Sequence, residues 1–185
     1  MNIEAIHSKN GKTYWVESGD TLYIQRLQSG QYQRSNWDFA KSILPQFRKC
    51  IDIGSNNACN AIHYAELFDW VECFEPVHTT QQLWQNTVKD NNVKNVTLHP
   101  YGLGECETHT NIILHERNAG HNHLFHYDKN PRAKQHKLTR KTQPVEVRTL
   151  DSFAFTDIDF VKIDVEGYEY YVLQGSTDTI ARCRP

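Results

Sequence analysis

Near the middle of the chain, short apolar runs alternate with amphipathic segments. The runs at 50–54, 70–75 and 96–99 are rich in β-branched and aromatic residues, which is typical of buried strands. The segments between them, at 58–68 and 79–89, carry apolar residues at helical spacing. Such an order of elements requires parallel strands joined by right-handed crossovers. The pattern therefore predicts an α/β fold, with a doubly wound parallel sheet and helices on both faces.

The N-terminal part, residues 1–45, follows a different pattern. Two β-rich runs, at 13–16 and 21–25, flank a Ser-Gly-Asp turn, which predicts a β-hairpin. Tyr23 in the second run is expected to pack against the protein, with stacking on a sugar as the alternative. Apolar residues within 37–44 predict a short helix that a proline ends.

The alternation of strands and helices breaks at residues 100–148. Two β-rich runs, at 112–114 and 145–147, flank a polar, histidine-rich stretch without periodicity, which predicts a loop insertion. Residues 115–148 hold eight basic and three acidic side chains, although the chain as a whole carries a net charge of −2. Such a basic segment either contacts an anionic partner or is a solvated loop.

Composition argues against several classes of protein. No run approaches the ~18 apolar residues of a membrane span. The first residues lack the basic and apolar segments of a signal peptide. The five cysteines are scattered, without a Cys-x-x-Cys pair, which argues against a disulfide framework or a zinc ribbon. This pattern suits a reducing compartment, so we expect a cytoplasmic protein.

Acidic residues stand at the ends of three predicted strands. Asp52 comes just before Gly54, Glu75 ends the second strand, and Asp164 ends a strand at 159–164. In such sheets ligands bind beyond the carboxyl ends of the strands, and an acidic residue after the second strand binds ribose hydroxyls. The glycine-rich dinucleotide fingerprint and the Walker pattern are both absent. Without a pyrophosphate cradle the site suits a cationic, phosphate-free nucleoside, and S-adenosylmethionine has those properties.

The motifs around these acidic residues resemble those of one known family. They are Asp52-Ile-Gly-Ser-Asn56, Phe74-Glu-Pro76, Thr149-Leu-Asp151 and Lys162-Ile-Asp-Val-Glu-Gly-Tyr-Glu169. They are similar to motifs of the FkbM family of class I S-adenosylmethionine-dependent methyltransferases, and the similarity runs from about residue 20 to the last residue. The resemblance implies a Rossmann-like sheet, S-adenosylmethionine as cofactor, and methyl transfer to a hydroxyl of a sugar, glycan or similar small molecule.

The resemblance also implies where the cofactor binds. Asp52, Gly54, Ser55 and Asn56 would form the turn at its methionine end. Glu75 would bind the ribose hydroxyls, and Tyr101 and Gly102, followed by Leu103, would lie near the adenine.

Methyl transfer to a hydroxyl also needs a general base. The candidates are Asp164 and Glu166 from the last motif and His121 from the insertion. For Glu166 the alternative is a structural carboxylate at a helix N-terminus. His121, His123 and His126 suggest a metal, but neighbouring cysteine ligands are absent and carboxylates are sparse, so we expect no metal site.

We expect a single domain over residues 1–185. Its parts are the N-terminal β-hairpin and helix (1–45), the cofactor-binding βαβαβ unit (46–99), the insertion (100–148), and a motif strand with a helix at 167–175 (149–185).

Two departures from the family pattern bear on this interpretation. Ala58 stands where the family has glycine, and its methyl group is expected to crowd the cofactor. The chain also reaches its last residues at 181–185, where the fifth of seven family strands would begin, so we expect a sheet truncated before its last three strands. The strand ending at Asp164 would then be a bare edge, which favours self-association.

Two other functions stay open. One is a noncatalytic methyltransferase-like module that binds a partner through the basic insertion. The other is a nucleic-acid methyltransferase, which we do not favour because the basic segment lacks the interleaved aromatic residues that stack on bases.

Overall fold

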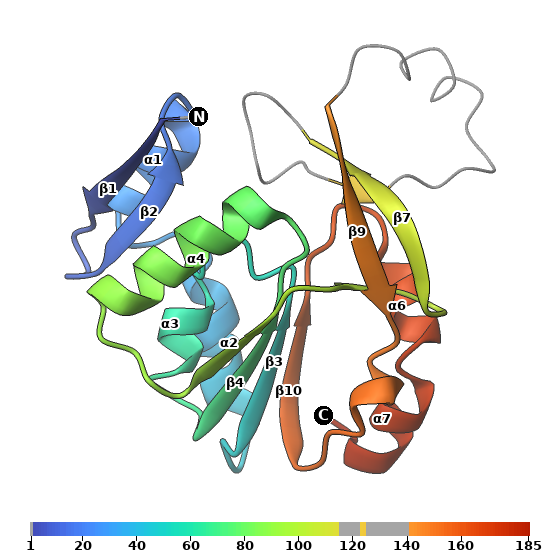
Figure 1. Ribbon diagram of the computed structural model, residues 1–185. Coiled ribbons are helices and arrows are strands. Elements are labelled where there is room, and N and C mark those ends of the chain that lie inside the picture. The colour runs from blue at the N-terminus through green and yellow to red at the C-terminus, as the bar shows by residue number, and fades with distance from the viewer. Residues whose placement is uncertain (1, 115–122, 125–140) are drawn as a thin grey trace.

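The computed structural model describes residues 2–114, 123–124 and 141–185. A four-stranded, all-parallel sheet stands at its centre (Figure 1), in the order β10-β3-β4-β5. The strands are β3 (Lys49–Ile53), β4 (Trp70–Phe74), β5 (Val96–His99) and β10 (Ile158–Ile163). The predicted α/β class and parallel sheet are thus confirmed.

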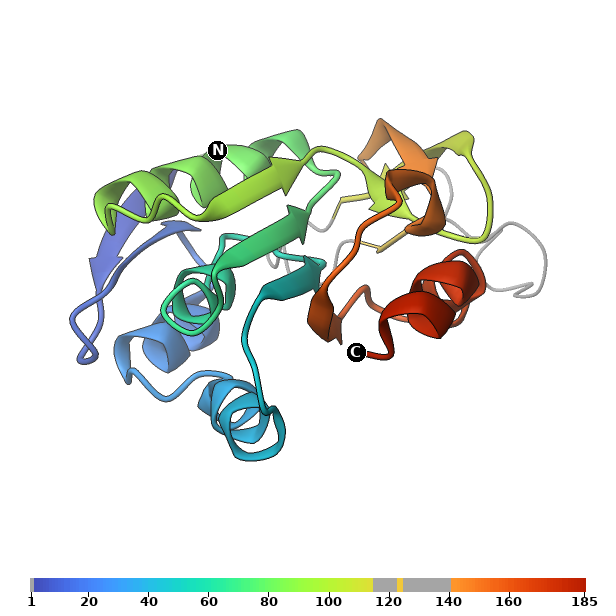
Figure 2. The ribbon, with the colours of Figure 1, turned by 90° about the horizontal axis from the view of Figure 1, so that it is seen from below.

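Side chains along β3 and β4 alternate between two apolar layers, as strand geometry requires. Cys50 and Cys73 pack with α3 (Ala61–Tyr64) and α4 (His78–Asp90), whereas Ile51, Ile53 and Phe74 pack toward the opposite layer. That second layer contains η2 (Asp151–Phe153), α6 (Glu169–Gln174) and α7 (Thr177–Cys183). Figure 2 shows the red C-terminal helices on the side of the sheet away from the N-terminal elements.

The N-terminal hairpin forms from different strands than predicted. β1 (Ile3–His7) pairs with β2 (Thr13–Glu17), and the run predicted as the second strand is α1 (Thr21–Gln28). Asp20 explains the difference, because its carboxylate caps the helix by accepting the backbone N–H of Tyr23 at 3.1 Å. A second helix, α2 (Arg34–Ile43), covers the predicted 37–44 segment.

Two predicted helices are shorter than expected because of backbone dihedrals. Ala58 has φ +68°, so the segment predicted as a helix from residue 58 becomes helical only at α3. Glu166 and Gly167 have φ +54° and +94°, which delays the start of α6 to Glu169. Glu166 therefore precedes the first turn of this helix.

The predicted loop insertion contributes a second sheet instead of only a loop. The strands of this second sheet lie in the order β6-β9-β7-β8. They are β6 (Gly102–Leu103), β7 (Thr108–Ile113), β8 (His123–Leu124) and β9 (Thr142–Arg148). His121 lies outside the described residues, as do most of the basic side chains. The basic residues of this segment that lie outside the described residues are Arg117, Lys129, Arg132, Lys134, Lys137 and Arg140.

Among the described residues, β10 has one neighbouring strand, β3, and its other edge is bare. The residues where a fifth strand was predicted to begin, at 181, instead form the end of α7. Exposed apolar side chains from α2, α6 and α7 border a groove along β10: Phe39, Ile43, Leu173 and Ile180. Within the described parts of the chain, no helix is both long and apolar enough to cross a membrane.

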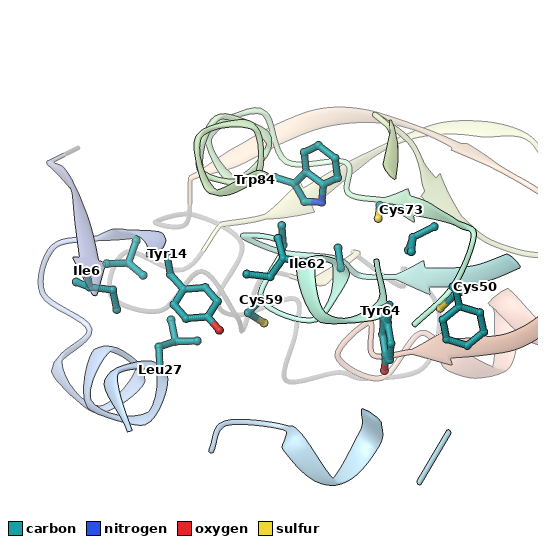
Figure 3. Close-up of a cluster of buried hydrophobic side chains, with 14 residues drawn as sticks. Ile6, Tyr14, Leu27, Cys50, Cys59, Ile62, Tyr64, Cys73 and Trp84 are labelled. Atoms are coloured by element: carbon teal, nitrogen blue, oxygen red, sulfur yellow. The ribbon is translucent and has the colours of Figure 1, made fainter. Parts of the chain in front are cut away.

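The N-terminal elements share one buried cluster with the central sheet. Figure 3 shows Ile6, Tyr14 and Leu27 on one side of Cys59, and Cys50 and Tyr64 on the other.

A polar contact joins the same parts. The Tyr14 hydroxyl lies 2.9 Å from Nε2 of His63, whose ring stacks on Trp37 at 3.7 Å. Burial lowers the pKa of His63 to about 4, so the fold holds this imidazole neutral.

Candidate functional site

A cavity opens at the carboxyl ends of β3, β4 and β10, where ligands bind in sheets of this type. Three segments line it. The strand ends contribute Ile53, Gly54, Asn56, Glu75, Lys162, Asp164 and Glu166. The second sheet and the segment before it contribute Tyr101, Gly102, Leu103, Ile112 and Leu124. The N-terminal half contributes Tyr23, Tyr32, Gln33, Cys59 and Asn60.

Asp52 lies beneath this cavity instead of lining it. Its carboxylate is fully buried, and its Oδ1 lies 3.1 Å from the Lys162 ammonium. Ser55, also buried and outside the cavity lining, donates its hydroxyl to Oδ2 of Asp52 at 2.8 Å. Two residues predicted to contact the cofactor thus form a buried support under the Gly54 turn.

Lys162 connects the parts of this support. Its ammonium donates to the Gly54 carbonyl at 2.8 Å and lies 3.9 Å from Oδ2 of Asp164. Burial alone would lower its pKa, but Asp52 and Asp164 outweigh burial and raise the pKa, so the amine stays protonated. Lys162 was not among the predicted site residues, although a lysine within an apolar strand was an available signal.

Gly54 occupies a position that no other residue fits. Its φ is +76°, and a Cβ placed on it would lie 2.0 Å from the backbone oxygen of Asp164. The backbone N–H groups of Gly54 and Ser55 both donate to the Phe74 carbonyl, at 3.1 and 3.0 Å. The turn after β3 is thereby joined to β4 and β10.

Glu75 presents a buried carboxyl to the cavity. Oε2 accepts the backbone N–H of Asn56 at 3.1 Å, and Oε1 accepts that of Val77 at 2.9 Å. Only 7% of the residue is exposed. Burial raises its pKa to about 7 in spite of these two hydrogen bonds, so the carboxyl changes charge near neutral pH.

The stability of the protein should show two opposing pH dependences. The neutral form of His63 favours folding, so its contribution is lost as the pH falls from about 6.5 to 4. The protonated form of Glu75 favours folding, so its contribution is lost as the pH rises from about 4.5 to 7. Each of these two pKa shifts corresponds to roughly 3 kcal/mol of folding free energy. We expect the free energy of unfolding of His63→Gln, minus that of the parent, to fall as the pH rises. The same difference for Glu75→Gln should increase as the pH rises.

Urea denaturation between pH 4 and 7.5 measures both effects. The quantity to compare is the difference between each variant and the parent, since carboxylates common to all three proteins then cancel. A variant whose difference from the parent does not change with pH would contradict the assignment for that residue.

An apolar wall lies opposite the strand ends. Gly102 and Leu103 form β6, and Leu103 is buried. The Arg148 guanidinium lies 3.9 Å from the centroid of the Tyr101 ring. The same guanidinium forms an ion pair of 2.7 Å with Glu146. A flat heterocycle suits a wall of this composition.

Asp164 and Glu166 stand at the mouth of the cavity, after β10. The Asp164 side chain is half exposed, whereas Glu166 occupies a left-handed backbone position. The Glu169 carboxylate supports this turn by accepting the N–H groups of Val165 at 3.1 Å and Gly167 at 3.2 Å. Strained residues of this kind are enriched at functional sites.

Ala58 does not line the cavity. It is fully buried, and its methyl group packs in the apolar cluster beside α3. Its φ of +68° shows why glycine suits this position: the backbone is left-handed, which costs a residue with a Cβ about 1–2 kcal/mol. The predicted crowding of the cofactor by this methyl group was therefore wrong.

Metal binding has no support in the described residues. There, no group of three or more histidine, cysteine, aspartate or glutamate side chains is arranged to hold an ion. The His121 segment lies outside these residues.

Strand order, the glycine turn and the carboxyls at the strand ends together define a Rossmann-like domain of the class I methyltransferase type. The methyltransferase FkbM domain model matches residues 52–185. The chain belongs to this family.

Two relatives are longer than the chain, and the chain matches part of each. Methyltransferase 1 of Beauveria bassiana (strain ARSEF 2860) is 26% identical over an alignment of 145 residues, which covers 69% of this chain and 58% of that protein. The crystal structure of methyltransferase FkbM from Methylobacillus flagellatus KT has a TM-score of 0.50 and 16% identity. The match covers 92% of this chain and 43% of the Methylobacillus flagellatus chain. The chain therefore spans about half the length of the relatives it matches.

Proposed function

We propose that this protein is an S-adenosylmethionine-dependent O-methyltransferase that acts on a hydroxyl of a sugar, glycan or similar small molecule. The observation that carries the proposal is one cavity lined by both Glu75, a buried acceptor for hydroxyl groups, and Asp164, a half-exposed carboxylate. The five cysteines are all free, which supports a cytoplasmic location.

The residues of the cavity fit this cofactor. The Glu75 carboxylate can accept two ribose hydroxyls, and the wall formed by Tyr101, Gly102 and Leu103 suits the adenine. Gly54 and Asn56 border the space assigned to the methionine end, while Asp52 and Ser55 hold their turn from below. When bound, the cofactor supplies an electrophilic methyl group.

Asp164 is the general base that the geometry favours. It lies at the mouth of the cavity, where a hydroxyl can approach it from solvent, and its Oδ2 lies 3.9 Å from the Lys162 ammonium. Glu166 borders the same mouth and is the second candidate. His121 stays a third candidate from outside the described residues.

The affinity for S-adenosylhomocysteine is expected to rise about tenfold from pH 6 to pH 8. The reason is that a ribose hydroxyl donates to the ionised form of Glu75, whose pKa is about 7. Isothermal titration at several pH values measures the effect, and Glu75→Gln should abolish it.

Glu72→Gln is the matched control for this titration. Glu72 is a buried glutamate on β4, three residues before Glu75, but it pairs with His99 at 2.8 Å and does not line the cavity. This variant should keep the pH dependence of the parent. If Glu75→Gln kept it as well, the ribose assignment would be wrong.

The two other functions have less support. The noncatalytic module was suggested by Ala58 and by the missing strands: Ala58 lies outside the cavity lining, while β10 keeps a bare edge among the described residues. Nucleic-acid methylation was suggested by the basic segment, most of which lies outside the described residues.

A further inference from the structure

One wall of the cavity comes from residues that the sequence motifs did not select. Tyr32 and Gln33 lie in the segment between α1 and α2, before the part of the chain that the family model matches. Asn60 precedes α3 and faces the same space. This wall comes from the N-terminal half of the chain, and none of its residues is among those assigned to the ribose or the adenine.

Gln33 ties this wall to the candidate base. Its side-chain amide donates toward Oδ2 of Asp164 at 3.5 Å and toward the Tyr32 hydroxyl at 3.4 Å, and its oxygen accepts from the Asn60 amide. The backbone of Gln33 has φ +54°, a left-handed conformation that costs a residue with a Cβ free energy. The fold thus places an amide beside Asp164 at the expense of local strain, as functional sites do.

The chemistry of this wall is that of uncharged polar recognition. It contains the amides of Gln33 and Asn60, which bond to each other while the Asn60 oxygen accepts the Trp37 indole N–H at 3.1 Å. It also contains the phenol of Tyr32, whose ring meets that of Tyr23 edge-on at 5.3 Å. Hydroxyl groups pair with amides and phenols, and the carbon faces of a sugar ring pack on aromatic rings.

The charges around this wall disfavour an anion. Among the described residues that line the cavity, the carboxyl groups of Glu75, Asp164 and Glu166 accompany one cationic side chain, Lys162. That ammonium already contacts Asp52, Asp164 and the Gly54 carbonyl. A phosphate placed beside Asp164 would meet a like charge, which is a means of rejecting wrong ligands.

We propose that Tyr32, Gln33 and Asn60 form the acceptor subsite, and that it selects an uncharged, hydroxyl-bearing molecule over its phosphate ester. The inference rests on the proposed function, because it assigns the acceptor half of that site.

The test titrates the full chain, saturated with S-adenosylhomocysteine, with the methyl glycosides of glucose, galactose and mannose and with their 6-phosphates. Side-chain amide signals of Gln33 and Asn60, followed by NMR, report binding at the subsite. We expect at least one methyl glycoside to shift both signals, and its 6-phosphate to bind at least tenfold more weakly.

Gln33→Gly separates recognition from folding. Glycine suits the left-handed backbone, so the melting temperature should stay the same or rise, while affinity for the glycoside falls at least tenfold. S-adenosylhomocysteine affinity should stay within twofold of the parent. Gln31→Ala, an exposed glutamine two residues away that does not line the cavity, should change neither affinity.

Three results would overturn the inference: no methyl glycoside binds, one binds without moving the Gln33 and Asn60 signals, or the phosphate esters bind as tightly. Failure of S-adenosylhomocysteine to bind would instead overturn the proposed function. The same glycoside titration, done without that ligand, then still reports on the subsite.

Discussion

Replacing Lys162 by methionine is expected to destabilise the protein by about 3–5 kcal/mol, because it leaves a buried carboxylate without its charge partner. Asp52 is fully buried, and among the described residues the Lys162 ammonium is the one group that meets its Oδ1. The Lys162 side chain is itself only 9% exposed, so solvent screens the pair weakly. The free energy of unfolding, measured in urea at pH 7, gives the effect.

The double variant Asp52→Asn with Lys162→Met shows whether charge is the cause. With both charges removed, most of the lost stability should return, since an unpaired buried ion costs more than a neutral polar group. Lys141→Met, at an exposed lysine, is the control and should change stability by less than about 0.5 kcal/mol. A double variant as unstable as the single one would show that Lys162 acts through packing, not through charge.

Gly54→Ala is expected to abolish S-adenosylhomocysteine binding and to cost several kcal/mol of stability. Its methyl group would lie 2.0 Å from the backbone oxygen of Asp164, and its φ of +76° is itself unfavourable for alanine. Because the obstacle is backbone and not a flexible side chain, the turn and β10 must separate. Thermal unfolding and ligand titration measure the two losses.

Two other glycines separate crowding from backbone conformation. Gly167 has φ +94° with nothing within 4 Å of an added Cβ, so Gly167→Ala should cost only about 1–2 kcal/mol. Gly175 has an ordinary negative φ, but its added Cβ would lie 1.9 Å from the Gly104 oxygen, so Gly175→Ala should destabilise strongly. If Gly167→Ala cost as much as Gly54→Ala, conformation and not crowding would dominate.

Local signals predicted the central sheet well. β5 matches the predicted run at 96–99, and β4 ends one residue before the predicted boundary, because strand residues and helix spacing alternate clearly there. The same signals failed at α1, where β-rich residues fold as a helix because Asp20 supplies its cap. Local propensity is a weak prior that a single cap can override.

The candidate site was only partly predictable for a different reason. Glu75 and Asp164 line the cavity because topology alone brings the ends of parallel strands together. Asp52 was expected to line the site, but no pattern along the chain reveals that its carboxylate is buried in an ion pair with Lys162. The contact between Gln33 and Asp164 spans 131 residues, so it depends on how the N-terminal elements pack against the sheet.

The edge position of β10 has a consequence for how the cavity responds to warming. This strand carries Lys162 and leads into Asp164, yet it is hydrogen-bonded to a single neighbouring strand in the described structure. At its start, the Arg48 guanidinium fastens it to the sheet by ion pairs to Asp157 and Asp159. Local opening of an edge element takes less free energy than global unfolding. The end of the cavity that holds Asp164 can therefore come apart while the rest of the molecule stays native, so that loss of the cavity on warming precedes melting.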